Sequence, residues 1–147
     1  MSKIVFASDH AGFALKQSLI EFVQGLGFEV EDKGDFTPEA KDDYPDFIDL
    51  AAKDISLDQT LRGIIIGGSG QGEAIAANRF KGVRAALWYG GDIQIVRLAR
   101  EHNDANILSL GARFVTLDEA KLAVQTFLET SFSNEERHLR RIKEIDL

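Results

Sequence analysis

The sequence of 147 residues contains no cysteine and only two prolines, one methionine and one tryptophan. The absence of cysteine excludes disulfide bonds, thiolate metal sites and a cysteine nucleophile or base. No apolar run approaches the roughly 20 residues of a membrane-spanning helix. Positive charge is also scarce, because 17 Lys and Arg stand against 24 Asp and Glu and leave a net charge of −7. This balance argues against a nucleic-acid binder or an anionic-membrane binder.

What the chain does contain is typical of a globular protein, with 44% hydrophobic and 28% charged residues. No Pro/Ser-rich linker, repeat or low-complexity stretch divides it, so we expect a single domain over residues 1–147. A chain of this size buries roughly 70% of its unfolded surface, which is enough for a real core. Because a strand pattern already begins at Lys3, we expect no secretory signal and a cytoplasmic protein.

Strand and helix patterns alternate along the chain. Short apolar or alternating runs predict five strands, at residues 3–8, 28–32, 63–67, 83–89 and 107–110. Apolar residues at helical spacing from Leu15 to Leu26 predict a first helix, which Gly25 and Gly27 end. Further helices are expected from Pro45, from about Glu73, over 92–102, from Thr116 to about Thr130 with Glu119 at capping-box spacing, and from about Asn134. Five strands that are each followed by a helix predict an α/β fold, a three-layer sandwich with a five-stranded parallel sheet, helices on both faces and a C-terminal helix.

Ligands of such sheets bind beyond the carboxyl ends of the strands. That rule selects four loops, at residues 8–12, 67–73, 89–92 and 111–113. The second of them reads Gly-Gly-Ser-Gly-Gln-Gly-Glu and carries four of the thirteen glycines. It is not a dinucleotide fingerprint, because Glu73 stands where a glycine is needed, and it is not a Walker loop, because no lysine follows Gly72.

Glycines allow the backbone to turn its N–H groups toward a ligand, and a helix N-terminus adds partial positive charge. A carboxylate at Glu73 would repel a phosphate, but it suits a loop that stabilises a developing oxyanion while Glu73 moves a proton. Two plainer interpretations stay open. In the first, the glycine loop is only a tight turn that binds no ligand. In the second, Glu73 is only an N-terminal helix residue, favoured there by the helix dipole.

Three histidines are present, and only His10 follows a strand directly. His102 precedes a strand, so the topology does not place it at the same edge, and His138 belongs to the last helix. A zinc site built from Asp9, His10 and His102 has no supporting ligand spacing, and we expect no metal.

Arg137 and Arg141 are four residues apart and share one face of the last helix. Residues 134–147 contain four basic and four acidic residues, so the whole net charge of −7 lies in residues 1–133. The two arginines are either part of a solvated helix with internal ion pairs or a forked clamp for a phosphate.

Several segments together resemble the family of type B ribose-5-phosphate isomerases, which also contains galactose-6-phosphate isomerase. They are residues 8–12 (Ser-Asp-His-Ala-Gly), 43–46 (Asp-Tyr-Pro-Asp), 67–78, 84–86 (Arg-Ala-Ala), 100–106 (Arg-Glu-His-Asn-Asp-Ala-Asn), 110–113 (Leu-Gly-Ala-Arg), and Arg137-His138 with Arg141. The order is that of the family and nearly the whole chain is covered. Residues 100–106 are the most specific of these segments.

The resemblance implies a Rossmann-like aldose–ketose isomerase of sugar phosphates that works without a metal or cofactor, as a homodimer or dimer of dimers with its site between subunits. It implies that the backbone of Gly68, Gly70 and Gly72 and the Ser69 hydroxyl stabilise an enediolate. His102 with Asp9 would open the sugar ring. The phosphate would be held by His10, Arg113, Arg137 and Arg141, and sugar hydroxyls would be contacted by Tyr44 and Asn103.

One position departs from much of the family. Many members carry a catalytic cysteine two residues before the Ser/Thr of the glycine loop, where this chain has Gly67. A second branch lacks this cysteine and has a glutamate at the start of the following helix, as here at Glu73. The expected reaction interconverts ribose 5-phosphate and ribulose 5-phosphate. Alternatives are a six-carbon substrate such as galactose or allose 6-phosphate, a non-catalytic sugar-phosphate sensor, and a nucleotide-binding module.

Overall fold

The structure is a computed structural model that describes residues 3–146. Its centre is a sheet of five parallel strands in the order β2-β1-β3-β5-β4. The strands are β1 (Lys3–Ser8), β2 (Glu29–Asp32), β3 (Arg62–Gly67), β4 (Ala85–Trp88) and β5 (Ile107–Gly111). The predicted α/β class with a five-stranded parallel sheet is confirmed.

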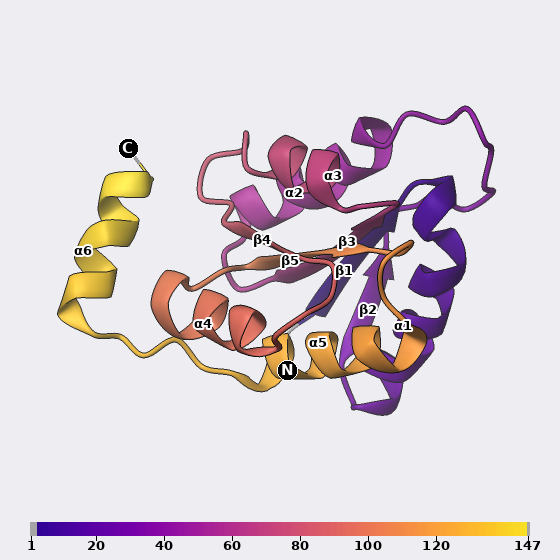
Figure 1. The fold of residues 1–147 in the computed structure, drawn as a ribbon. Coiled ribbons are helices and arrows are strands. Elements are labelled where there is room, and N and C mark those ends of the chain that lie inside the picture. The colour runs from indigo at the N-terminus through magenta and orange to yellow at the C-terminus, as the bar shows by residue number, and fades with distance from the viewer. Residues whose placement is uncertain (1–2, 147) are drawn as a thin grey trace.

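Helices cover both faces of the sheet (Figure 1). One face is packed by α1 (Phe13–Gly25), α4 (Gln94–Asn103) and α5 (Leu117–Glu129), and the other by α2 (Pro45–Leu57) and α3 (Gln71–Ala77). Successive strand side chains point to opposite faces. Ile64 and Ile66 therefore pack into the first core, and Ile65 packs into the second. Within residues 3–146, no helix combines the length and the apolar character needed to cross a membrane.

Several expected boundaries are confirmed. Thr116 and Glu119 form a capping box at the start of α5, and α1 ends at Gly25, followed by Gly27 with φ +97°. Others differ from the expectation. The helix after the glycine loop begins at Gln71 rather than Glu73, since the Ser69 hydroxyl accepts the Gln71 N–H at 3.2 Å and starts the turn early.

Three further boundaries also differ. The fourth strand begins at Ala85 rather than Val83, because the Arg84 N–H donates to the Asn106 side chain at 2.8 Å instead of joining the ladder. α4 occupies Gln94–Asn103 rather than 92–102, since the Asp92 carboxylate accepts the Gln94 N–H at 2.9 Å in a turn before the helix. The last helix, α6 (Glu136–Ile145), begins two residues after Asn134, whose φ of +60° is not helical.

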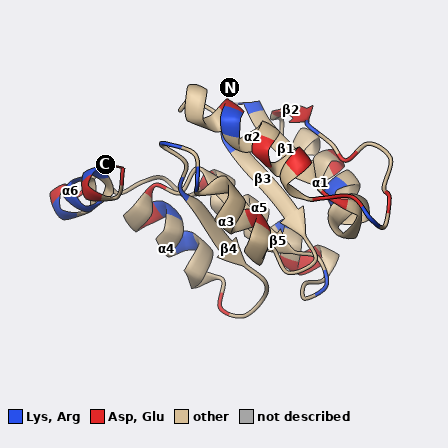
Figure 2. Cartoon of the chain, turned by 90° about the horizontal axis from the view of Figure 1, so that it is seen from above, with Lys and Arg blue, Asp and Glu red and all other residues tan. Residues whose placement is uncertain are grey.

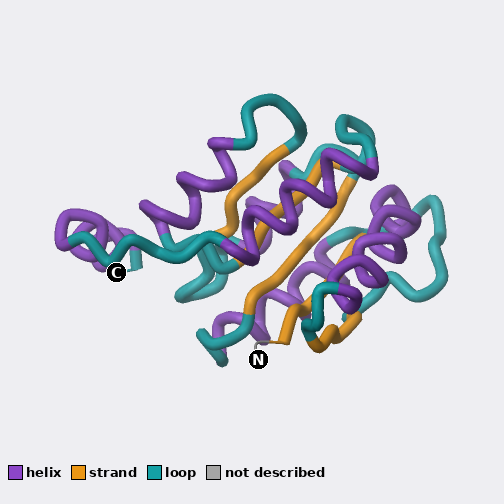
Figure 3. The backbone as a smooth tube through the Cα atoms, turned by 90° about the horizontal axis from the view of Figure 1, so that it is seen from below, coloured by secondary structure: helices purple, strands orange, loops and turns teal. Residues whose placement is uncertain are grey.

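α6 stands at the side of the molecule next to α4, at the end of an extended connection (Figures 1 and 3). It carries both signs of charge (Figure 2). Arg84 ties it to α4, because its guanidinium donates to the Asp146 carboxylate at 3.0 Å and to the Asn103 carbonyl at 3.0 Å. The ends of α4 and α6 are thereby held together.

Backbone pairing continues past the strand ends at the carboxyl edge of the sheet. The Ala112 and Arg113 N–H groups donate to the carbonyls of Gly67 and Gly68 at 2.8 and 3.0 Å. On the other side of β1, the N–H of Asp35 donates to the Ser8 carbonyl at 2.7 Å. This pairing aligns the loops after β1, β2, β3 and β5 side by side, which is the edge where the sequence places its candidate site.

Candidate active site

The glycine loop at residues 68–70 joins β3 to α3. Gly70 has φ +78°, a backbone conformation that disfavours any side chain, and a Cβ there would lie 2.9 Å from the Leu110 carbonyl. Within residues 3–146, the N–H groups of Gly68, Ser69 and Gly70 donate to no acceptor. The Ser69 hydroxyl accepts the Gln71 N–H and keeps its own proton to donate. The loop therefore presents several donors to an anion at the start of a helix.

Glu73 lies in the first turn of α3 with only 5% of its surface exposed. Its carboxyl group occupies the space directly over Gly67, where a Cβ would collide with it. Burial raises the pKa of Glu73, a backbone hydrogen bond partly opposes this, and the nearby Asp9 carboxylate adds to the increase. A carboxyl group with a raised pKa beside N–H donors is suited to take up a proton from a substrate and to return it.

Two further side chains close around this loop. The phenolic hydroxyl of Tyr44, the residue before α2, lies against Gly72, and the Arg113 guanidinium lies over Gly68, 3.1 Å from where a Cβ would stand. Any side chain at either glycine would push these groups away. Arg113 gives the carboxyl edge a cation, while Tyr44 gives it a hydroxyl that can donate or accept.

Asp9 and His10 come directly after β1. Asp9 is 7% exposed, and its Oδ1 accepts the N–H groups of Ala11 and Gly12 at 3.0 and 3.3 Å, which caps a 3-10 turn at His10–Gly12. His10 Nδ1 lies 2.6 Å from Asp42 Oδ1, and this hydrogen bond is the main reason that the pKa of His10 is raised. His10 is thus favoured as a cation next to the loop.

Asp9, His10 and Asp42 also form a group of side chains that could hold a metal ion, because each offers one potential ligand atom and these atoms lie within 4.8 Å of one another. These atoms already have hydrogen-bond partners, since Asp42 Oδ1 lies 2.6 Å from His10 Nδ1 and Asp9 Oδ1 accepts the backbone N–H groups of the turn. A metal-bound imidazole nitrogen carries no proton and cannot make such a bond. The geometry suits a hydrogen-bonded histidine better than a metal ligand set.

The remaining predicted residues lie elsewhere in the chain. α4 leads into β5, so His102 and Asn103 in its last turn lie at the amino edge of the sheet. The His102 ring stacks on His138 of α6, with ring centroids 4.3 Å apart. α6 also carries Arg137 and Arg141, both exposed. Within one chain the structure therefore does not bring His102 to Asp9.

The structure shows an ion pair for Arg137 itself. Its guanidinium donates to Glu135 Oε1 at 2.8 Å, and this bond holds the pKa of Glu135 below its usual range. Both groups are about half exposed, so the pair adds little stability. Arg137 can therefore release Glu135 and bind another anion, provided that this anion binds the guanidinium more strongly than the Glu135 carboxylate does.

Comparison with known proteins places this geometry in a family. The profile of the ribose/galactose isomerases matches residues 4–145. The chain belongs to the ribose/galactose isomerase family. It is 43% identical over 140 residues to ribose-5-phosphate isomerase B of Mycolicibacterium paratuberculosis, covering 95% of this chain and 87% of the relative. It is 37% identical to ribose-5-phosphate isomerase B of Escherichia coli, covering 99% and 95% of the two chains.

Solved structures of the ribose/galactose isomerase family share the fold. Ribose 5-phosphate isomerase from Thermotoga maritima superposes with a TM-score of 0.91 at 44% identity, covering 99% of this chain and 97% of that one. Ribose-5-phosphate isomerase B from Mycoplasma genitalium, solved with bound ribulose-5-phosphate, gives a TM-score of 0.93 at 42% identity, covering 97% and 93%. A relative with nearly the same backbone thus accommodates the ketose phosphate.

Sequence reasoning missed two acids beside this site, the buried Asp35 and Asp42, whose side chain is 9% exposed. Asp35 follows β2, so the carboxyl-edge rule applied to the second strand would have selected it. Asp42 stands one residue before the Asp43-Tyr44-Pro45-Asp46 segment and reaches His10 across 32 positions of sequence. No spacing rule connects those two positions, because their contact depends on the path of the loop between β2 and α2.

Proposed function

We propose that the chain interconverts ribose 5-phosphate and ribulose 5-phosphate, as its family membership and the arrangement around Glu73 support. The observation that carries the proposal is the buried carboxyl group of Glu73, held over Gly67 beside loop N–H groups that have no acceptor in the described part of the chain. An aldose–ketose isomerase needs one base that moves a proton between adjacent carbons and donors for the negative charge that forms meanwhile. Both are present within one loop and one helical turn.

In the proposed reaction, the Glu73 carboxylate removes the proton from C2 of the open-chain aldose. The C2–H electron pair forms the C1–C2 double bond, and the carbonyl π electrons move to O1. The N–H groups of the loop and the Ser69 hydroxyl stabilise the resulting enediolate, where loss of a single such donor costs about 3–4 kcal/mol of barrier. Protons then shift between the two oxygens, and Glu73 returns its proton to C1 to give the ketose.

The substrate's phosphate requires positive charge in an acidic chain. His10 and Arg113 supply it at the carboxyl edge, where the Arg113 cation partly opposes the raised pKa of His10. Arg137 and Arg141 are the further candidates, with His102 for ring opening and Asn103 for a sugar hydroxyl. Since these four lie toward the other end of the chain, we propose that a second copy contributes them and completes the site.

Exposed apolar surface supports such a homodimer. A groove of about 470 Å³ lies over α3 and β4 and is lined by Ile75, Leu87 and Tyr89 among others. Ile75 and Tyr89 are 60% and 48% exposed. Burying them against a second copy would remove apolar area from water beside the glycine loop. A dimer of dimers would use further surface of the same kind.

We also propose that the reaction needs no metal or cofactor, because its proton transfers are assigned to protein groups. The proposed partners are then a sugar phosphate and a second copy, with neither nucleic acid nor membrane involved. A charged sugar phosphate does not cross a lipid bilayer unaided, so the proposed setting is the cytoplasm and the pentose phosphate pathway.

The test is an isomerisation assay with ribose 5-phosphate, allose 6-phosphate and galactose 6-phosphate. We expect the largest kcat/KM for the five-carbon substrate. A larger value for a six-carbon phosphate would assign the chain to that substrate. Binding of sugar phosphates without turnover of any of them would contradict the proposed isomerase activity and favour the alternative of a non-catalytic sugar-phosphate sensor.

A further inference from the structure

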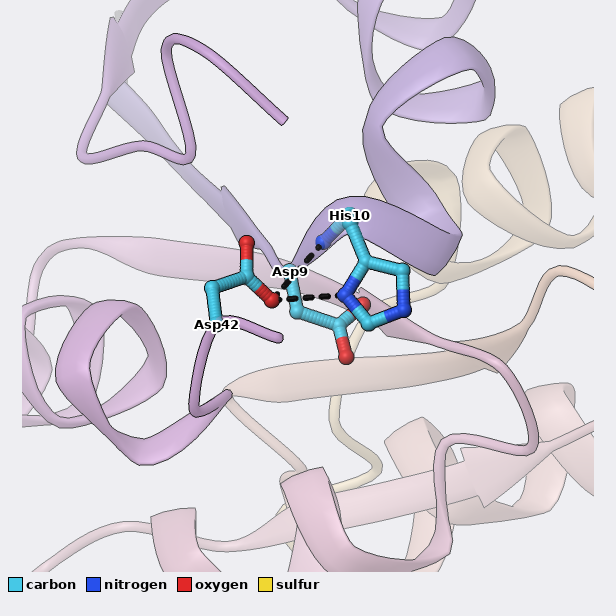
Figure 4. Close-up of side chains that lie close together, drawn as sticks. All are labelled: Asp9, His10 and Asp42. Atoms are coloured by element: carbon cyan, nitrogen blue, oxygen red, sulfur yellow. Dashed lines mark hydrogen bonds and ion pairs between the residues drawn. The ribbon is translucent and has the colours of Figure 1, made fainter. Parts of the chain in front are cut away.

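Two carboxyl groups lie on the side of His10 that carries Nδ1. Asp42 contacts His10 directly, and Asp35 neighbours Asp42. Asp42 Oδ1 lies 2.6 Å from His10 Nδ1 and also accepts the His10 backbone N–H at 3.4 Å (Figure 4). The Asp42 side chain is 9% exposed, and the His10 side chain is 31% exposed. The acid is thus buried behind an imidazole whose other edge reaches the site.

Asp35 is the second carboxyl group, and the backbone fixes its place. Its N–H donates to the Ser8 carbonyl at 2.7 Å, and its own carbonyl accepts the Nζ of fully buried Lys16 at 2.6 Å. Asp35 is 3% exposed. Its Oδ1 accepts the Thr37 N–H at 3.0 Å, and its carboxyl group lies near enough to Asp42 for each acid to shift the pKa of the other.

A proton shared between the two acids would account for two buried oxygens that otherwise have no partner among residues 3–146. Asp35 Oδ2 and Asp42 Oδ2 are both buried, and neither has a donor among residues 3–146 while both groups are ionised. One shared proton satisfies both oxygens and removes the repulsion of two buried like charges. Burial and the bond to Asp42 raise the pKa of Asp35. Burial opposes ionisation of Asp42, but hydrogen bonds from Asp35 and His10 outweigh it and lower the pKa of Asp42.

The charges around His10 agree with this arrangement. Asp42 and Asp9 favour its charged form, while Arg113 and partial burial oppose it. Lys16 is the charged group that faces Asp35 from α1. Because Nδ1 is committed to Asp42, Nε2 is the nitrogen left to donate, and within the described residues it makes no hydrogen bond.

We propose that Asp35 and Asp42 are positioning residues, which hold His10 as an imidazolium with its Nε2–H directed at the phosphate of the substrate. Protonated Asp35 donates to ionised Asp42, and Asp42 accepts Nδ1–H of His10. The inference rests on the proposed function for the identity of the ligand. The hydrogen-bonded chain of three side chains can be tested without it.

The first test is kinetic and uses Asp42→Asn. The amide no longer supplies the charge that favours imidazolium, so KM for ribose 5-phosphate should rise about tenfold at pH 8, the scale of one charge-assisted hydrogen bond. The increase should shrink toward pH 6, where His10 is protonated without help. kcat should stay within about twofold, since binding common to ground and transition states is lost. The competitive inhibition constant of inorganic phosphate should follow KM.

The matched control is Glu39→Gln, which removes one negative charge from an exposed position of the same loop. It should leave KM at the wild-type value throughout the pH range. An Asp42→Asn enzyme with wild-type KM at pH 8, or an equal rise in the control, would overturn the proposal.

The second test measures His10 directly, by NMR titration of protein labelled with 15N-histidine. The chain has three histidines, and the His10 signal is assigned from its loss in His10→Gln. In wild type, Nδ1 should stay protonated while Nε2 titrates. The His10 midpoint should fall in Asp42→Asn and stay unchanged in Glu39→Gln. An unchanged midpoint in Asp42→Asn contradicts the proposal, even in a protein that turns over no sugar phosphate.

The role of Asp35 is tested by a conservative rescue. Asp35→Asn carries an amide N–H that can replace the shared proton, so His10 should titrate as in wild type. Asp35→Ala removes the donor, and the His10 midpoint should change. Should Asp42→Asn fail to fold, as judged by circular dichroism, this pair carries the test alone. Identical titrations in the two Asp35 variants would remove Asp35 from the chain of hydrogen bonds.

Discussion

The ring of His102 stacks on the ring of His138, with centroids 4.3 Å apart and an angle of 17° between the planes. This contact joins the last turn of α4 to α6. Burial and the neighbouring Arg137 and His102 side chains lower the pKa of His138, against an opposing effect of Glu135, so the stack is favoured with a neutral His138. The contact brings His102 and Asn103 near the helix that carries Arg137 and Arg141, and we propose that these four residues form one half-site, with Glu73, Asp9, His10 and Arg113 as the other.

Two half-sites in one chain predict complementation between inactive variants. Glu73→Gln and the double variant Arg137→Ala/Arg141→Ala should each lose activity at low substrate concentration. After the two are unfolded together and refolded, about half of the dimers are mixed, and each mixed dimer has one intact site, so about a quarter of wild-type activity should return. The measurement is kcat/KM before and after mixing. No recovery would mean that each chain builds its site alone.

Arg137→Ala or Arg141→Ala singly should raise KM for ribose 5-phosphate about tenfold, because a charge-assisted hydrogen bond to the phosphate is lost. Arg140→Ala is the matched control, since it removes an equally exposed cation from the same helix. Steady-state kinetics decide the point. Equal KM values for all three variants and wild type would leave α6 with a structural role only.

Glu73→Gln should lower kcat by at least about a thousandfold while the fold persists, because the amide cannot accept the substrate proton. Since the carboxylate is the active form, wild-type kcat should rise with pH through the raised pKa of Glu73. Near-normal turnover of the glutamine variant would remove Glu73 as the base.

The same pKa shift has a consequence for stability. A carboxyl group with a raised pKa in the folded state binds its proton more tightly there, so wild type loses stability as pH rises through the window above the unfolded value. The melting temperature of Glu73→Gln relative to wild type should therefore increase from pH 4 to pH 8. A difference that does not change with pH would contradict the shift.

Gly67→Ala should displace the Glu73 carboxyl group, because the added methyl takes its place. Misplacement by about 1 Å can cost about a hundredfold in rate, so kcat should fall by about that factor. The fold should persist, since the displaced group is the far end of a flexible side chain. Gly63→Ala in the same strand is the control, because its Cβ would meet Ile107 in the core and so affect stability rather than kcat.

Incubation with a strong chelator should leave activity unchanged, since the proposed proton transfers use only protein groups. The assay is turnover of ribose 5-phosphate before and after dialysis against the chelator. Lost activity that returns with added zinc would contradict the metal-free proposal.

Periodicity and turn chemistry made the fold predictable from sequence. Short apolar runs, and alternation in residues 28–32, located the strands, and Thr116 with Glu119 located a helix start to the residue. The strand order β2-β1-β3-β5-β4 was not predicted, because it depends on packing between distant elements. Boundaries moved where a side chain, such as Ser69 or Asn106, competes with the backbone for a hydrogen bond.

The site was only partly predictable for the same reason. The carboxyl-edge rule selected the loops that carry Asp9, Glu73 and Arg113, since parallel strands end at one edge. It could not indicate that Asp42 would reach His10, because that contact spans a loop without regular structure. Nor could it indicate how the half-sites combine, which depends on a surface outside the single chain.

The place that Glu73 occupies over Gly67 constrains how the two branches of the family can exchange. A cysteine introduced at position 67 would contest the space of the Glu73 carboxyl group, so that one change alone crowds the site with two groups. Loss of Glu73 alone leaves neither base. A thiolate base at position 67 and a carboxylate base at position 73 would therefore compete for one space, so that replacing one base by the other requires changes at both positions.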